Sequence, residues 1–170
     1  MSPAKWAIVA WGIGGVVLLL GQAVLRLSPH ALSILDGSLT PVQWAIAAGW
    51  IAFMLYSEAW RGFHKQFSPR VVVRSLGLAK DPGPWLVLFA PVVAMGLFYG
   101  TRKRLIVSRS LLVGIVLLII SVRFLQAPWR GIIDAGVVLG LLFGTLSLLY
   151  FAARAVAGNP PDVPAEFPAS

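Results

Sequence analysis

The chain has 170 residues, of which 58% are hydrophobic and 12% are charged. An average soluble domain carries roughly 25% charged residues, so the composition argues against a water-exposed globule and predicts a membrane protein. The net charge of +8 lies in short loops beside apolar runs, where it indicates topology and contact with anionic headgroups rather than nucleic-acid binding. The absence of cysteine excludes disulfides, thiolate metal sites and cysteine nucleophiles.

Five apolar segments predict an all-α fold, a polytopic membrane helical bundle, because helices satisfy their own backbone hydrogen bonds in hydrocarbon. The first run is longer than the apolar region of a signal peptide, so we expect it to be retained. A Pro-rich tail at residues 159–170 is expected to be disordered. The segments are expected within a single membrane domain, residues 1–158, at about 6–25, 41–60, 82–101, 106–125 and 132–153.

The second segment begins at Pro41, which suits the first turn of a helix capped by Thr40. The stretch 67–78 that follows contains a Ser-Pro helix-start signal and two arginines, Arg70 and Arg74, four residues apart. This pattern predicts either a short helix in the headgroup plane or a solvated loop, and the sequence favours neither.

The third segment, residues 82–101, opens with Pro-Gly-Pro, is interrupted by Pro91 and is followed at once by a basic cluster. If all five segments span and the N-terminus is cytoplasmic, 8 basic residues lie inside and 6 outside. If the third segment enters and returns on one side, the numbers become 11 and 3. The positive-inside rule therefore favours a re-entrant third segment, with a Pro-kinked span as the alternative.

Three charged residues lie close to the ends of apolar segments, where a charge costs less than at the bilayer midplane. Arg123 and Asp134 flank the same short turn, which predicts an ion pair between them. Glu58 has Arg61 at i+3, which favours a local structural role. The alternative is a proton or cation relay between Glu58 and His64, two helical turns apart.

The basic residues around the second and third segments are the expected contacts for anionic lipid headgroups. Aromatic residues near the segment ends, chiefly tryptophans, predict an interfacial belt. The expected headgroup contacts are Arg61, Lys65, Arg70, Arg74, Arg102, Lys103 and Arg104.

Glycines at four-residue spacing predict helix faces that pack closely. The triple Gly136, Gly140 and Gly144 lies in the fifth segment. The pair Gly96 and Gly100 repeats the spacing in the third. The pattern does not distinguish packing within the chain from association of two copies.

Two strings carry a resemblance to other proteins: YSEAWRGFHKQFSPRVVVRS (Tyr56–Ser75) and PWRGIIDAGVVLG (Pro128–Gly140). In these the chain resembles an uncharacterised family of small bacterial inner-membrane proteins of comparable length. The resemblance covers most of segments two to five and implies no activity and no site residues.

The sequence contains no paired acids, zinc-protease motif, phosphate loop or nucleophile elbow, so no catalytic residue, metal or cofactor is expected. The favoured function is a non-enzymatic, multi-pass protein of the bacterial inner membrane with a cytoplasmic N-terminus. It would act through helix association, as an accessory or assembly subunit or as a homo-oligomer, with a basic face on anionic lipid. A small transporter or channel using Glu58, and a lipid-headgroup-binding protein or enzyme, are the alternatives.

Overall fold

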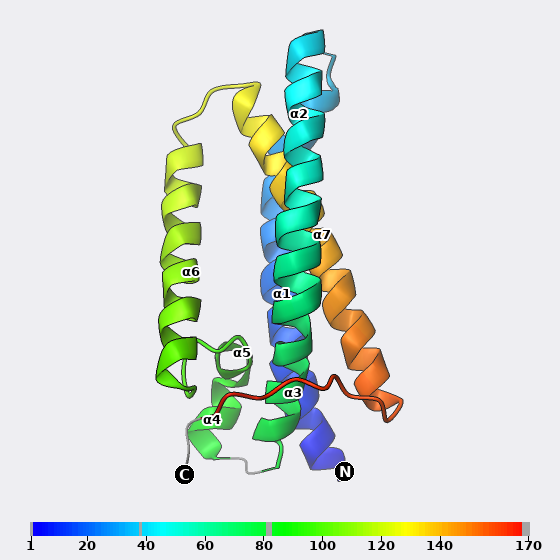
Figure 1. The fold of residues 1–170 in the computed structure, drawn as a ribbon, viewed down its shortest axis with the longest axis vertical. Helices are drawn as coiled ribbons and strands as arrows, with labels where there is room; N and C mark the ends of the chain where they lie inside the picture. The colour runs from blue at the N-terminus through cyan, green and yellow to red at the C-terminus, as the bar shows by residue number, and fades with distance from the viewer. Residues whose placement is uncertain (1, 38, 81–82, 168–170) are drawn as a thin grey trace.

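A computed structural model describes residues 2–37, 39–80 and 83–167, and every regular element in these ranges is helical (Figure 1). The all-α prediction is therefore confirmed for the described part of the chain. In chain order the elements are α1 (Pro3–Leu32), η1 (Ser33–Leu35), α2 (Pro41–Met54), η2 (Leu55–Phe67), α3 (Ser68–Leu78), α4 (Pro84–Leu88), α5 (Ala90–Ala94), α6 (Arg102–Val122) and α7 (Trp129–Val156).

The core of the bundle is the pair α1 and α7, which pack along much of their length. Within the described ranges, α1 continued by η1 and α7 are the two helices long and apolar enough to cross a membrane. Helix α6 adds a shorter apolar stretch, Ser108–Val122. The structure thus indicates membrane association, whereas five membrane spans are not confirmed.

Helices α2, η2 and α3 follow one another without a break and form one long rod beside α7 (Figure 1). The second segment does not end near Trp60 as expected. The stretch 67–78 contains the short helix α3, the first of the two alternatives, but it continues the rod instead of standing apart from it. The charged residues after Trp60 continue the rod as a π-helix, in which the Ser68 amide donates to the Phe63 carbonyl five residues earlier. The return to α-helix coincides with Pro69, which has no amide hydrogen to donate.

The third apolar segment forms two short helices, α4 and α5, instead of one long one. Phe89 interrupts them with non-helical backbone angles, and the chain then turns at Gly96, whose φ is +79°. Helix α6 starts at the same end of the bundle as α4 and α5, and the N-terminus lies at that end as well (Figure 1). The segment therefore enters and leaves at one end of the bundle.

Two glycines of α1 allow neighbouring helices to pack closely, Gly12 against α3 and Gly15 against α5. A Cβ on Gly12 would lie 2.8 Å from the Ser75 hydroxyl of α3. A Cβ on Gly15 would lie 2.8 Å from the Pro91 Cβ and closer still to its Cγ. Since a proline ring cannot rotate away, the fit of α5 against α1 depends on glycine at position 15.

The tail after α7, for which the sequence favoured disorder, is extended in its described part. It crosses the bundle end in front of α3 and reaches α4 (Figure 1). Phe167 lies so near α3 that a Cβ on Gly77 would come within 2.6 Å of its ring. The tail thus adds contacts to the end of the bundle that holds α4 and α5.

Substitution of Gly15 by alanine is expected to destabilise the protein by about 1–3 kcal/mol, because the new methyl group overlaps Pro91. Gly14 is the matched control, since a Cβ there meets nothing within 4 Å and gains the higher helix propensity of alanine. Thermal unfolding in detergent, followed by tryptophan fluorescence, should show a lower Tm for Gly15→Ala alone. Equal effects of the two substitutions would contradict the observed packing of α5.

Candidate functional site

The most completely enclosed cation of the described structure is Arg74 of α3, which is 1% exposed. Its Nε donates to the Val93 carbonyl of α5 at 2.8 Å. One terminal nitrogen, Nη2, donates to the carbonyls of Phe98 and Tyr99 at 3.3 and 2.7 Å. The other, Nη1, donates to those of Ala165 and Glu166 at 2.6 and 3.4 Å.

Arg74 therefore joins three segments that are distant in sequence: α5, the turn before α6 and the C-terminal tail. Its guanidinium also lies 4.7 Å from the centre of the Phe167 ring, within the range of a cation–π contact. The tail is held a second time where the Thr101 amide donates to the Glu166 carbonyl at 3.0 Å. Gly100 borders this arrangement, since a Cβ there would lie in van der Waals contact with Arg74 Nη1, at 3.6 Å. We name these contacts the Arg74 clamp.

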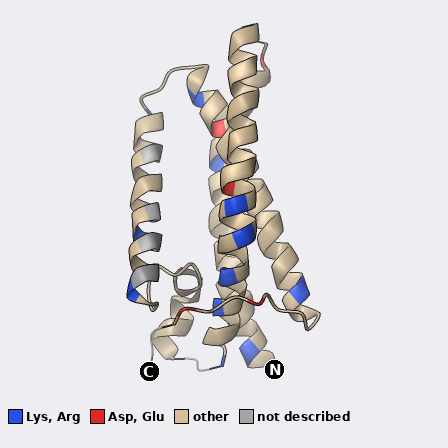
Figure 2. Ribbon diagram, in the orientation of Figure 1, with Lys and Arg blue, Asp and Glu red and all other residues tan. Residues whose placement is uncertain are grey.

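One of the residues predicted to contact lipid headgroups, Arg74, has a different role in the structure. Arg74 faces the interior, where backbone carbonyls take up its donors, so it is not a headgroup contact in this structure. Arg70 is half-buried, whereas Arg61, Lys65 and Arg102 are exposed. The side chains of Lys103 and Arg104 lie outside the described residues. Figure 2 shows the basic residues gathered along η2 and α3 and at the ends of α6 and α7.

The three glycines of α7 meet the α2–η2 rod, so the structure places this face inside the chain. A Cβ on Gly136 would lie 2.5 Å from Trp50 Nε1, and one on Gly144 would lie 2.5 Å from the Phe63 ring. Gly140 faces Glu58, whose Oε2 would be 3.4 Å from such a Cβ. Close packing of the α2–η2 rod on α7 thus requires glycine at 136 and 144, whereas a Cβ at 140 would make an ordinary contact.

The π-helix keeps one face of the rod directed at α7. Along α2 the residues that meet α7 are four apart, and along η2 they are five apart, as expected when hydrogen bonds change from i−4 to i−5. Without this change the contact face would turn away from α7 in the lower half of the rod. Residues of this face at these spacings are Trp50, Met54, Glu58, Phe63 and Ser68, and His64 next to Phe63 meets α7 as well.

The suggested relay pair, Glu58 and His64, is not brought together. His64 Nδ1 lies 2.9 Å from the Ser147 hydroxyl, and its ring stacks on Trp60 with centres 4.8 Å apart. Glu58 instead faces Gly140, seven residues before Ser147 on α7, which is about 10 Å along a helix. A direct proton transfer between the two side chains has no support in this geometry.

Asp134 pairs with a different arginine from the one expected. Its carboxylate lies 3.6 Å from Arg130 Nε, one turn earlier in α7. Arg123 is exposed near the end of α6. Because α7 begins at Trp129, both Arg130 and Asp134 lie in its first two turns, and the i, i+4 geometry brings them together.

Gly96 and Gly100 do not lie on a helix face, contrary to the predicted packing pair. Gly96 adopts a left-handed conformation directly after α5, and Gly100 borders the Arg74 clamp. The four-residue spacing arises in a turn, because the third segment is too broken to continue as a helix. Their contribution is to the turn that returns the chain to α6.

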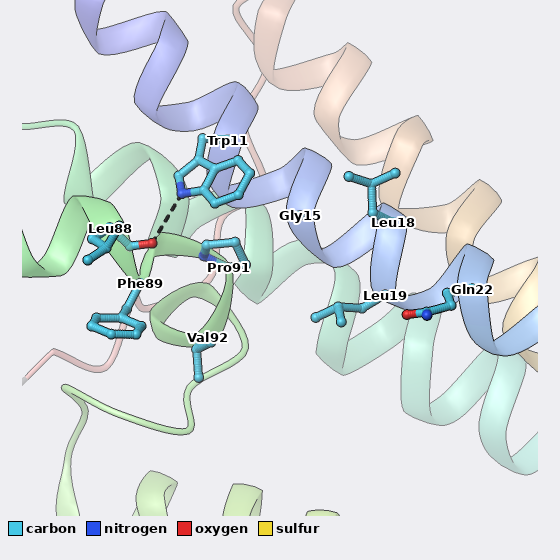
Figure 3. A pocket seen from close by; sticks show the side chains of 9 residues that line it. All are labelled: Trp11, Gly15, Leu18, Leu19, Gln22, Leu88, Phe89, Pro91 and Val92. Atoms are coloured by element: carbon cyan, nitrogen blue, oxygen red, sulfur yellow. Dashed lines mark hydrogen bonds between the residues drawn. The ribbon is translucent and has the colours of Figure 1, made fainter.

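An open apolar hollow of about 320 Å³ lies between α1 and the α4–α5 segment (Figure 3). Trp11 closes one side, and its indole nitrogen donates to the Leu88 carbonyl at 3.3 Å. Gln22 supplies an amide to a lining that is otherwise aliphatic and aromatic. Nothing in this lining is arranged for acid–base or metal chemistry.

Sequence reasoning missed the inward position of Arg74 and the role of the α1 glycines. A signal for Arg74 was present, since it shares a helical face with Val71 and Leu78 at spacings of three and four. Gly12 and Gly15, three apart, are a comparable signal for close packing. The identity of their partners depends on the tertiary fold.

Comparison with protein-family models, with curated proteins and with solved structures finds no match to this chain.

Replacement of Arg74 by lysine is expected to lower the free energy of unfolding by at least about 2 kcal/mol, because hydrogen bonds to charged groups contribute about 1.5–3 kcal/mol each. Lysine keeps the charge but lacks the planar fork that reaches three segments. Arg26→Lys, at an exposed position, is the control. Denaturation in detergent measures both, and cleavage by a protease specific for glutamate should reach Glu166 faster in Arg74→Lys. Unchanged stability and cleavage would contradict the clamp.

Proposed function

We propose that this chain is a non-enzymatic, multi-pass protein of the bacterial inner membrane that acts through helix association. It serves as an accessory or assembly subunit, or as a homo-oligomer, with its basic cytoplasmic face on anionic lipid. The observation that carries this proposal is the position of α6, which stands apart from the bundle between the turn at Thr101 and the loop before α7 (Figure 1).

Most of the described apolar side chains of α6 are exposed. Leu117 is 59% exposed and Ile106 is 58% exposed. A helix that contacts its own chain this little is stabilised by its surroundings, either lipid or helices of another protein. The other strongly exposed apolar residues of α6 are Val113, Ile115, Val116, Ile119 and Ile120.

The glycine ladder of α7 gives no support to self-association through that face. Gly136 and Gly144 are buried against Trp50 and Phe63 of the same chain. A second copy could reach them only by displacing the α2–η2 rod. Association through α6 and the outer face of the rod is therefore favoured.

The shape of the third segment supports the proposed topology. The N-terminus, the α4–α5 segment, the start of α6 and the end of α7 share one end of the bundle (Figure 1). This arrangement is the re-entrant topology that the sequence favoured with 11 basic residues inside against 3 outside, a count that placed Arg61 and Lys65 after the end of the second segment. We assign that end to the cytoplasm, where anionic headgroups attract basic side chains.

The two alternatives have less support. A transporter using Glu58 would need a partner for proton exchange, and His64 faces Ser147 instead. A headgroup-binding site would lack Arg74, because this side chain is buried in the fold. Association is the function that uses the exposed apolar residues of α6.

Single cysteines test the topology, since the natural chain has none. We expect Lys5→Cys, Arg102→Cys and Asn159→Cys to react with an impermeant maleimide in inverted vesicles, and Asp36→Cys to react in intact spheroplasts. The physical reason is the return of the third segment to the side on which it entered. Labelling of Arg102→Cys together with Asp36→Cys would identify a kinked span instead.

The association itself is tested by mass measurement in native-membrane nanodiscs, where we expect a particle with more protein than one chain of 18.3 kDa. A photo-crosslinking residue in place of Leu117 should form an adduct with a second chain. The same residue at the fully buried Leu148 is the control and should form none. A strict monomer that forms no adduct from Leu117 would overturn the proposal.

A further inference from the structure

The outer face of η2 carries two cations, Arg61 and Lys65, that are both exposed. They lie among aromatic residues, since Tyr56 is 61% exposed and Trp60 is 42% exposed. Lys65 Nζ is 5.5 Å from the centre of the Trp60 ring. We name Tyr56, Trp60, Arg61 and Lys65 the η2 outer face.

The contacts of η2 with α7 show at what depth this face would lie in a membrane that α7 crosses. Phe63 packs against Gly144, and His64 contacts Ser147. Both positions lie near the middle of α7, which runs from Trp129 to Val156 and is apolar enough to cross a membrane. Arg61 and Lys65 flank Phe63 by two residues on each side, so Arg61 lies beside the middle of the apolar helix and Lys65 about one turn past it.

Exposed cations at this depth are costly in lipid. An arginine or lysine at the bilayer centre costs at least about 2.5–3.5 kcal/mol. Extension to the headgroups relieves that cost only near helix ends, whereas the half-thickness of the hydrocarbon core is about 15 Å. The η2 outer face therefore needs a polar or oppositely charged neighbour.

Charge complementarity identifies the chemistry of that neighbour. A symmetric contact with a second copy would place Arg61 and Lys65 against the same two cations. The acid at a comparable height, Glu58, faces Gly140 of its own chain. Among the other described acids, Asp134 is buried near the start of α7, and Asp36 lies beyond the end of η1. Asp162 and Glu166 lie in the tail that crosses the bundle end, away from the middle of η2 (Figure 2). The described part of a second copy thus offers no matching carboxylate.

We propose that the η2 outer face binds a transmembrane helix of a different membrane protein, one that carries an aspartate or glutamate near its midpoint. The carboxylate would pair with Arg61 and Lys65, and apolar residues of the helix would pack on Tyr56 and Trp60. This inference rests on the proposed function and specifies it, because it makes the chain an accessory subunit of another protein.

A defined probe tests the proposal: a synthetic leucine-rich transmembrane peptide with one central glutamate, and the same peptide with glutamine. Energy transfer from the labelled, full-length protein to each labelled peptide is measured in phosphatidylcholine vesicles at pH 8. We expect the glutamate peptide to bind about tenfold more tightly, a ratio typical of one polar contact between helices. The double variant Arg61→Gln, Lys65→Gln should lose this preference.

The matched control is Arg26→Gln, Arg154→Gln, which removes two exposed cations in α1 and α7, away from η2, and should retain the preference. Equal binding of both peptides to the natural protein would overturn the proposal, as would loss of the preference in the control. A preference that disappears when phosphatidylglycerol is added would overturn it in favour of a lipid phosphate. Efficient disulfide formation between two copies of Tyr56→Cys would overturn it in favour of self-association.

The inference and the proposed function fail separately. If native nanodiscs contain an assembly crosslinked through Leu117 but neither peptide is preferred, association stands and the η2 outer face is not its site. If the particle is a strict monomer while the glutamate peptide is preferred, the face binds acids, but the proposed function fails.

Discussion

The hydrogen bonds of the buried Arg74 hold together the end of the molecule at which α3, α5, the turn before α6 and the C-terminal tail meet. A guanidinium removed from water needs all its donors satisfied, and here backbone carbonyls of α5, the following turn and the tail accept from it. None of these segments is a regular helix long enough to stabilise itself. The return of the third segment to its own side of the bundle therefore depends on one side chain of α3.

The same rod that supplies Arg74 also determines the middle of the bundle. Its π-helical part keeps the contact face on α7 while charged residues continue outward on the opposite side. On the side of the rod that faces α7, Phe63 packs against Gly144 and His64 contacts the Ser147 hydroxyl. One continuous helix thus combines close internal packing with an outer face that carries Arg61 and Lys65.

These two features separate the charges of the chain into classes with different physical roles. Arg74 is internal and structural, whereas Arg102 at the bundle end is exposed, in a position suited to headgroups. Arg61 and Lys65 are exposed at the depth where lipid offers no partner. The proposed association accounts both for the exposed Arg61 and Lys65 and for the exposed helix α6. Neither a proton relay nor a headgroup-binding site accounts for both.

The sequence by itself determined the helical class, the apolar segments and the irregular character of the third, because hydropathy, proline and glycine act locally. It did not determine that η2 continues the second helix, since charged residues after Trp60 are compatible with a loop until α7 supplies a surface for Phe63 and His64. It placed Arg74 at the lipid surface and Asp134 opposite Arg123. Only the tertiary structure decided these partners, because hydrogen bonds and ion pairs form between segments whose proximity no local pattern encodes.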